Sequence, residues 1–332
     1  STASRRPLMP CRPRWRPEPQ LVVESTESTT EILRQTCFVT GADQNYFWLV
    51  AAAVQSLREN APSLQLKVMD FGFSPQQATF LEAQGLLLAR PRGVPTGLHP
   101  YTLKTLFAAY VSGLSHSNFA WFDSDIICTD PQVTGISEVL SRMKAQGVHV
   151  AACPDMGPHP TLSQFANAFH APALADFVTR NAQCAQRPYL NTGFILFSDA
   201  SRFLDEWPRI TSRIQGEICI DQNAFNILFH QNSQAGFILP SRRWNAHSRL
   251  LSEVKEVGGR LYCGDQAVTF LHCTSNGNTL HQEQVLSIKI AGVEQKARFK
   301  TFRDPLLGKI QLGYLSRFVK LHAAALRAHG VA

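Results

Sequence analysis

From Cys37 onward, short apolar runs typical of strands alternate with segments whose apolar residues recur at helical spacing. Such alternation predicts βαβ units and therefore an α/β fold, with a central, mostly parallel but mixed sheet flanked by helices. We expect strands at 37–40, 64–69, 86–89, 118–122, 148–152, 193–198, 236–239 and 268–272. Helices are expected from 47, 74 and 103, and near 133–145, 171–182, 201–213 and 222–230.

Two carboxylates, Asp123 and Asp125, follow the predicted strand at 118–122 with only Ser124 between them. In an open α/β sheet, ligands bind at the carboxyl ends of the strands. Carboxylates this close repel each other unless a cation lies between them, so one interpretation is a divalent metal site that holds a diphosphate. The other interpretation is a turn that Asp caps without any ligand.

The formal net charge of +7 is unevenly distributed. Residues 1–20 carry +4 and residues 286–332 carry +7, so the body between them is mildly acidic at −4. This distribution argues against a nucleic-acid-binding domain and is compatible with a cation site.

Composition separates the two ends of the chain from its body. Residues 1–30, rich in Pro, Arg, Ser and Thr, are expected to form a flexible tail. Residues 286–332 are expected to be a basic extension that contains an amphipathic helix around Leu315–Leu326. We favour packing of that helix on the body of the chain, with peripheral contact to an anionic membrane as the alternative.

Eight cysteines are scattered without any Cys-x-x-Cys pair, so we expect free, buried thiols rather than a zinc ribbon or a thioredoxin motif. No Asn-x-Ser/Thr acceptor and no run of about 18 apolar residues occurs. We therefore predict a cytoplasmic protein, or one in the Golgi lumen if an N-terminal anchor has been removed.

Eight fragments follow one another along the chain, at 38–46, 68–74, 123–125, 150–155, 189–193, 221–226, 239–245 and 270–272. In this order they resemble retaining nucleotide-sugar glycosyltransferases of the glycogenin and bacterial lipopolysaccharide galactosyltransferase type. The chain is also similar to the related plant-type sugar transferases. The resemblance implies the GT-A fold, a Rossmann-like nucleotide-diphospho-sugar transferase fold, and it implies that residues 31–285 form the catalytic domain.

The same resemblance implies that His272 joins Asp123 and Asp125 as the third metal ligand. An imidazole ligand favours Mn²⁺, with Mg²⁺ as the second choice because Mg²⁺ prefers oxygen ligands. The competing interpretation of His272 is a hydrogen-bonded strand histidine without a metal.

The resemblance also assigns residues to the donor. Those implied at the nucleotide and its phosphates are Thr40, Ala42, Asp43, Asn45, Tyr46, Ser124 and Gly193, and those implied near the sugar are Asp155, Asn191, Asp221 and Gln222. Lys104 is expected to pair with Asp155 or to touch the phosphate, with a solvated helix residue as the alternative.

One departure from the family concerns the residues after the metal histidine. The family follows that histidine with Gly and then Lys-Pro-Trp, whereas this chain reads Cys-Thr-Ser-Asn-Gly-Asn at 273–278. The cation expected at the diphosphate is therefore missing, and Arg242, Arg243 or Arg260 is expected to replace it.

The function implied is transfer of a hexose or pentose from a UDP-sugar to a glycan, lipid-linked or protein acceptor, with retention at the anomeric carbon. A sugar nucleotidyltransferase is the first alternative, although residues 41–44 do not resemble its Gly-rich basic loop. A catalytically decayed nucleotide-sugar-binding protein is the second.

Overall fold

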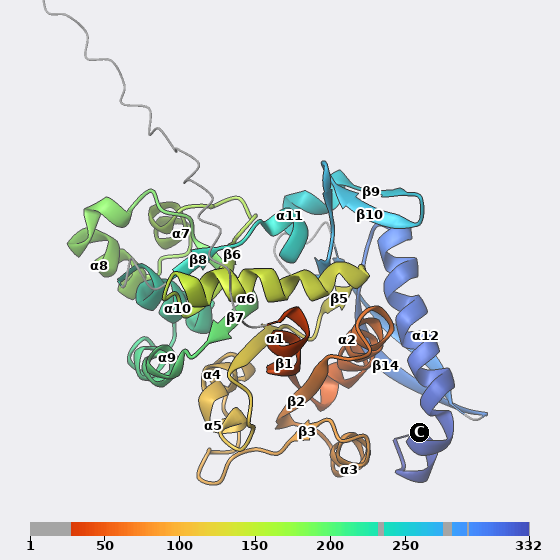
Figure 1. Cartoon of the computed structure of the whole chain (residues 1–332). Helices are drawn as coiled ribbons and strands as arrows, with labels where there is room; N and C mark the ends of the chain where they lie inside the picture. The colour runs from red at the N-terminus through yellow and green to blue at the C-terminus, as the bar shows by residue number, and fades with distance from the viewer. Residues whose placement is uncertain (1–27, 232–235, 275–280, 291, 332) are drawn as a thin grey trace, which may run out of the picture.

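The computed structural model describes residues 28–231, 236–274, 281–290 and 292–331. Across these ranges, a seven-stranded sheet has the order β3-β2-β1-β4-β7-β6-β8 (Figure 1). The strands are β1 (Thr36–Asp43), β2 (Gln65–Gly72), β3 (Leu87–Leu88), β4 (Asn118–Phe122), β6 (Val150–Pro154), β7 (Leu190–Ser198) and β8 (Gly236–Ile238). Only β7 runs antiparallel to its two neighbours, so the predicted mostly parallel, mixed sheet is confirmed.

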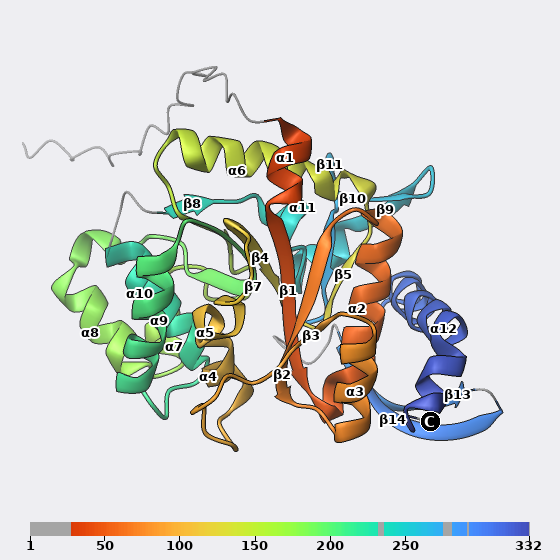
Figure 2. The same cartoon turned by 60° about the horizontal axis from the view of Figure 1, so that its bottom comes forward.

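Both faces of this sheet are buried, because successive side chains of a strand point to opposite faces. Phe38 of β1 packs into one apolar cluster and the next residue, Val39, into the other. The first cluster includes residues of α1 (Thr29–Arg34), α2 (Phe47–Asn60), α3 (Pro75–Ala83) and α6 (Ile136–Ala145). The second includes residues of α4 (Pro100–Thr105), α5 (Phe107–Val111), α9 (Ser201–Arg213) and α10 (Ile220–Gln231). Figure 2 shows these four helices on the other side of β1 from α2 and α3.

Local signals account for several helix boundaries. Ser74 and Gln77 form the capping box expected before α3, with Pro75 at the first helical position. The helix expected from 103 is instead two short helices, because α4 ends at Thr105 and α5 begins at Phe107.

Beside α10 lie α7 (Leu162–Ala168) and α8 (Pro172–Arg180), which enclose a small third core.

The strand expected at 268–272 lies outside the central sheet. It is β12 (Phe270–His272), and it pairs antiparallel with β5 (Ile126–Cys128), which directly follows the Asp-Ser-Asp turn. Nearby are α11 (Ser241–Trp244) and a small sheet of β9 (Val254–Val257), β10 (Arg260–Cys263) and β11 (Gln266–Ala267).

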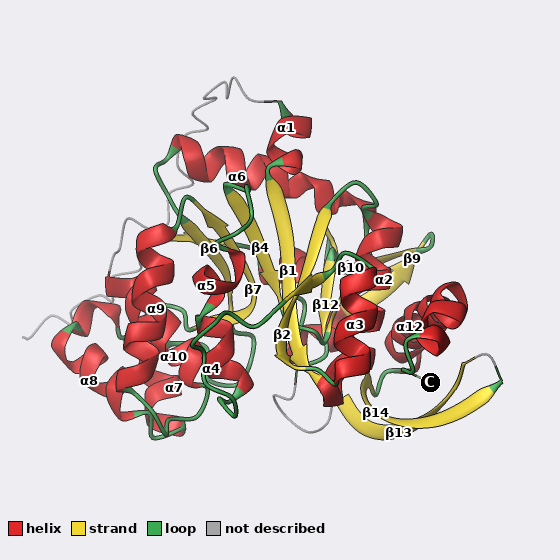
Figure 3. Cartoon of the chain, turned by 90° about the horizontal axis from the view of Figure 1, so that it is seen from below, coloured by secondary structure: helices red, strands yellow, loops and turns green. Residues whose placement is uncertain are grey.

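The C-terminal part is a long hairpin followed by a helix. Strands β13 (His281–Ile290) and β14 (Val293–Phe302) pair antiparallel, and β13 runs across position 285, where the catalytic domain was expected to end. Helix α12 (Pro305–Ala328) then lies along α2 (Figure 3).

Helix α12 buries the apolar face that the sequence predicts for it. Phe318 is buried and its ring contacts Phe80 of α3, while Arg317 forms an ion pair with Glu59 of α2. Leu321, at 68% exposure, points away from the core. The packing interpretation is therefore confirmed for most of this face, and contact with a membrane stays a prediction.

Three further expectations concern the N-terminal tail, the cysteines and membrane-spanning helices. The predicted tail lies outside the described residues as far as residue 27, and α1 begins at Thr29. The cysteines that the structure describes are free thiols, as expected. Among the described residues, no helix is long and apolar enough to cross a membrane.

Candidate active site

The metal-ligand set predicted from the sequence comes together at the carboxyl end of β4. Asp123 and Asp125 occupy the turn between β4 and β5, and the register of β5 with β12 places His272 opposite Ile126. Nε2 of His272 lies 3.2 Å from Oδ1 of Asp125 and 3.9 Å from Oδ2 of Asp123. One ligand atom from each of the three residues lies within 4.8 Å of the others.

A hydrogen-bond chain orients His272. Its Nδ1 lies 3.0 Å from Oδ1 of Asn245, and Nδ2 of Asn245 donates to Oδ1 of Asn191 over 2.8 Å. Because the Asn245 amide nitrogen is engaged with Asn191, the Asn245 oxygen is left to accept from a protonated Nδ1. The Nε2 lone pair of His272 then faces the two carboxylates. Two carboxylates and one imidazole, oriented in this way, fit a divalent cation such as Mn²⁺.

Asp125 remains ionised in this environment. Burial by itself would raise the pKa of Asp125, but the contact of its Oδ2 with the Lys300 ammonium outweighs burial and holds that pKa well below its usual range. The carboxylate is therefore available as a ligand throughout the physiological pH range.

Gly193 gives the His272 ring its space. A Cβ at position 193 would lie 2.3 Å from Cε1 and 2.6 Å from Nδ1 of His272. We expect Gly193→Ala to displace the ring and to weaken Mn²⁺ binding roughly 10–100-fold, the usual effect of disturbing a ligand's support. Isothermal titration with Mn²⁺ measures the effect, and Gly113→Ala is the control because no atom lies within 4 Å of its new Cβ. Equal Mn²⁺ affinity of the two variants would contradict the role of His272.

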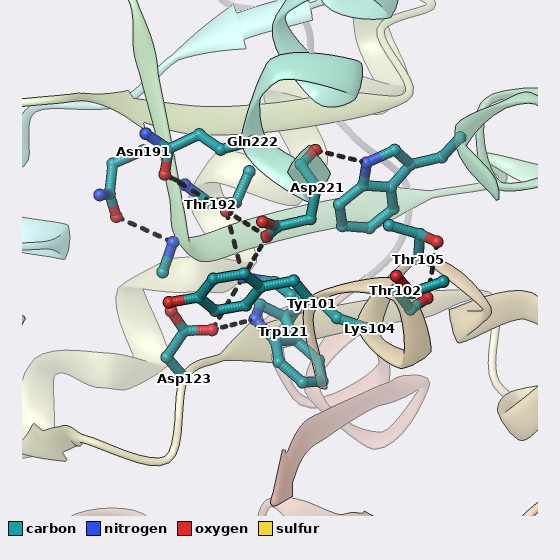
Figure 4. Close-up of polar contacts among 12 residues, drawn as sticks. Tyr101, Thr102, Lys104, Thr105, Trp121, Asp123, Asn191, Thr192, Asp221 and Gln222 are labelled. Carbon is teal, nitrogen blue, oxygen red and sulfur yellow. Dashed lines mark hydrogen bonds and ion pairs between the residues drawn. The ribbon is translucent and has the colours of Figure 1, made fainter. Parts of the chain in front are cut away.

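The ammonium of Lys104, on α4, lies between the Asp-Ser-Asp turn and helix α10. Its Nζ lies 2.8 Å from Oδ1 of Asp123, 3.3 Å from Oδ2 of Asp221 and 3.1 Å from Oγ1 of Thr192 (Figure 4). The side chain is only 5% exposed, so the interpretation as a solvated helix residue is wrong. The expected pairing with Asp155 is also wrong: Lys104 lies between Asp123 and Asp221 instead.

Asp221 and Asp155 are both held in place by neighbouring polar groups. Asp221, in the first turn of α10, accepts a hydrogen bond from Oγ1 of Thr192 over 3.0 Å. Asp155 lies behind the cavity wall, where its Oδ2 accepts from the amides of Asn191 at 3.1 Å and Gln222 at 3.3 Å. Asp155 therefore positions Asn191 and Gln222 and does not line the cavity itself.

The metal-ligand set opens into a cavity of about 430 Å³. The site residues expected from the sequence that line it are Ala42, Asp43, Tyr46, Lys104, Asp123, Ser124, Asp125, Asn191, Asp221, Gln222 and His272. Thr40 is fully buried and Asn45 is exposed, and neither is part of the lining. Gly193 is not part of the lining either, and its lack of a side chain leaves room for the His272 ring.

Sequence reasoning missed Lys300 of β14, which lines the cavity and forms an ion pair with Oδ2 of Asp125. The arginines expected to supply a cation lie elsewhere. Arg260 pairs with Asp130, Arg242 pairs with Glu253, and Arg243 stacks on Trp244. The polar-apolar alternation of 281–302 was a signal for strands, but nothing in it indicates contact with Asp125.

The mostly parallel seven-stranded sheet and the helices that flank it match solved glycosyltransferases of the GT-A fold, which is the fold that the resemblance implies. The solved galactosyltransferase LgtC, in complex with donor and acceptor sugar analogues, matches with a TM-score of 0.50 and 13% identity, over 88% of this chain and 99% of LgtC. The glycosyltransferase GlyE of Streptococcus pneumoniae matches with a TM-score of 0.51 and 13% identity, over 88% of this chain and 64% of GlyE. No protein-family model and no curated protein sequence matches the chain. These likenesses establish the fold, and the retaining, glycogenin-type assignment stays a prediction.

Proposed function

We propose that this chain is a metal-dependent glycosyltransferase that takes a hexose or pentose from a UDP-sugar. The observation that carries the proposal is the convergence of Asp123, Asp125 and His272 in the lining of a cavity that Asp221 and Gln222 also line. A nucleoside diphosphate needs a cation at its phosphates, and the sugar needs polar groups on the far side of the bond that breaks. The cavity offers both sets of groups.

The residues that line the cavity have separate proposed roles. A divalent cation bound by Asp123, Asp125 and His272 would neutralise the charge that develops on the leaving phosphate. Lys104 fixes the orientation of Asp123 relative to Asp221, and Asn191 and Gln222, held by Asp155, present amide groups to the sugar. Asp43 and Tyr46, at the end of β1, are placed to contact the nucleoside end of the donor.

The acceptor is proposed as a glycan, lipid-linked or protein hydroxyl. LgtC was solved with both donor and acceptor sugar analogues, so the shared fold is compatible with a second sugar beside the donor. Tyr101 lines the cavity and remains 45% exposed, and aromatic rings of this kind commonly stack against sugars.

A thermal-shift panel tests donor binding. We expect UDP and at least one UDP-sugar to raise the melting temperature by several degrees in the presence of Mn²⁺, and by much less with a chelator, because a ligand stabilises only the state it binds. A shift caused by a nucleoside triphosphate together with a sugar phosphate, but not by UDP, would indicate a nucleotidyltransferase instead. No shift with any nucleotide would contradict the proposal.

We further predict retention of anomeric configuration. An inverting enzyme needs a carboxylate base free to activate the acceptor, whereas Asp221, in the cavity lining, is engaged by Lys104 and Thr192. A carboxylate fixed in this way is better suited to support an oxocarbenium-like state. Proton NMR of the first-formed product from an α-linked UDP-sugar should show an α-anomer, and a β-anomer as the first product would contradict the prediction.

A further inference from the structure

Lys300 reaches the candidate metal site from the C-terminal hairpin. It lies on β14, directly opposite Glu283 of β13, and its ammonium contacts Oδ2 of Asp125 while His272 contacts Oδ1 of the same carboxylate. The Lys300 side chain is 11% exposed and, with Glu283 and Tyr46, forms one side of the cavity. The hairpin is therefore part of the cavity wall.

The position of this ammonium competes with a bound metal for the charge of Asp125. Lys300 contacts Oδ2, and a metal held between Asp123, Asp125 and His272 would take the side of Oδ1. Two cations on one carboxylate repel each other at close range, so a bound metal would weaken the contact of Lys300 with Oδ2.

Among the described residues that line the cavity, five are carboxylates and two are lysines: Asp43, Asp123, Asp125, Asp221 and Glu283 with Lys104 and Lys300. Lys104 contacts three partners in a buried position and is fixed. Lys300 carries a flexible stem at the edge of the open cavity, so it is the lysine that can be relocated. A diphosphate entering beside the metal is the anion that a displaced ammonium would contact.

We propose that Lys300 is an exchangeable counter-ion: it neutralises Asp125 in the metal-free protein and transfers to the diphosphate when metal and donor bind. This inference rests on the proposed function. It identifies Lys300 as the residue that supplies the positive charge expected beside the diphosphate, and it makes the C-terminal hairpin part of the donor-binding site. It also predicts that removing the charge of Lys300 strengthens the binding of Mn²⁺ and weakens the binding of UDP.

The test compares Lys300→Gln with Lys296→Gln by isothermal titration of Mn²⁺ alone and then of UDP at saturating Mn²⁺. Lys296 lies on the same strand but is exposed and does not line the cavity, so its substitution removes an equal charge from the same hairpin. For Lys300→Gln we expect tighter binding of Mn²⁺ alone, because a competing cation is gone. We expect UDP binding to weaken roughly 10–100-fold, because a charge-assisted contact is lost.

The outcomes separate the alternatives. Weaker binding of both ligands to Lys300→Gln would assign Lys300 a purely structural role and overturn the proposal, as would affinities equal to those of wild type. Lys300→Arg, which keeps the charge, is expected to restore most of the UDP affinity if Lys300→Gln folds poorly. If the wild-type chain binds UDP without Mn²⁺ and binds no Mn²⁺, the metal site of the proposed function fails, and the role of Lys300 fails with it.

Discussion

Asp125→Ala is expected to lower the rate of UDP release from the donor by about a thousandfold. The estimate follows from the several kcal/mol by which a bound metal stabilises the leaving charge, since each 1.36 kcal/mol is worth about a factor of ten in rate. Asp125 is the residue to change because it contacts both His272 and Lys300. Its loss removes one metal ligand and also releases the lysine that competes for the site.

The controls for this variant address the lysine left behind. Asp125→Asn keeps an oxygen near Lys300 but removes the negative charge, so it should lose Mn²⁺ affinity without leaving the ammonium unpartnered. Asp265→Ala removes an exposed carboxylate that does not line the cavity and should retain most of the activity. An Mn²⁺-induced thermal shift equal to that of wild type in Asp125→Ala would reject the ligand assignment.

Lys104→Met is expected to destabilise the fold by about 3–5 kcal/mol, the usual cost of removing one partner from a buried ion pair. The substitution keeps most of the aliphatic stem, so the loss reports the charge. Without the ammonium, Asp221 keeps the hydroxyl of Thr192 but has no cation beside it, and Asp123 keeps the indole N–H of Trp121 at 2.8 Å. Urea unfolding at neutral pH measures the change.

Two comparisons make the Lys104 result specific. Lys320→Met, on the exposed side of α12, should change the free energy of unfolding by less than about 0.5 kcal/mol. Mn²⁺ should stabilise Lys104→Met more than it stabilises wild type, because the metal would return positive charge next to Asp123. If Lys104→Met lowers the free energy of unfolding by less than about 1 kcal/mol, the ion pairs of Lys104 with Asp123 and Asp221 contribute little to stability, and the expectation from the burial of Lys104 is wrong.

The sheet could be predicted from the sequence because each strand is encoded by a local apolar run. Phe38 and Val39 belong to opposite faces that are both buried, and a strand covered on both faces produces an uninterrupted apolar segment. The break between α4 and α5 was not foreseen, because the apolar spacing continues through Leu106. Nor was the partner of β12, since pairing with β5 depends on tertiary contacts and not on propensity.

The candidate site was predictable only where residues follow in a recognisable order. Asp123, Asp125 and His272 were found in this way, whereas the ion pair from Lys300 to Asp125 joins positions 175 apart in the chain. Lys104 was singled out, but its partners were not, because the approach of α4 to α10 is set by packing. Asn245 was part of a matched fragment, yet its hydrogen bond to His272 follows from the tertiary structure alone.

The measurement that tests the central claim most directly is UDP release from a panel of UDP-sugars, followed with Mn²⁺, after addition of a chelator, and after Mn²⁺ is restored in excess. The account predicts that at least one donor yields UDP with Mn²⁺, that the chelator stops the reaction, and that added Mn²⁺ restores it. Asp125→Ala should release UDP about a thousandfold more slowly than wild type with Mn²⁺, and restored Mn²⁺ should not raise its rate to that of wild type. Binding of UDP-sugars without release of UDP from any of them, in water or with added sugar acceptors, would contradict the claim and leave a nucleotide-sugar-binding protein with the GT-A fold.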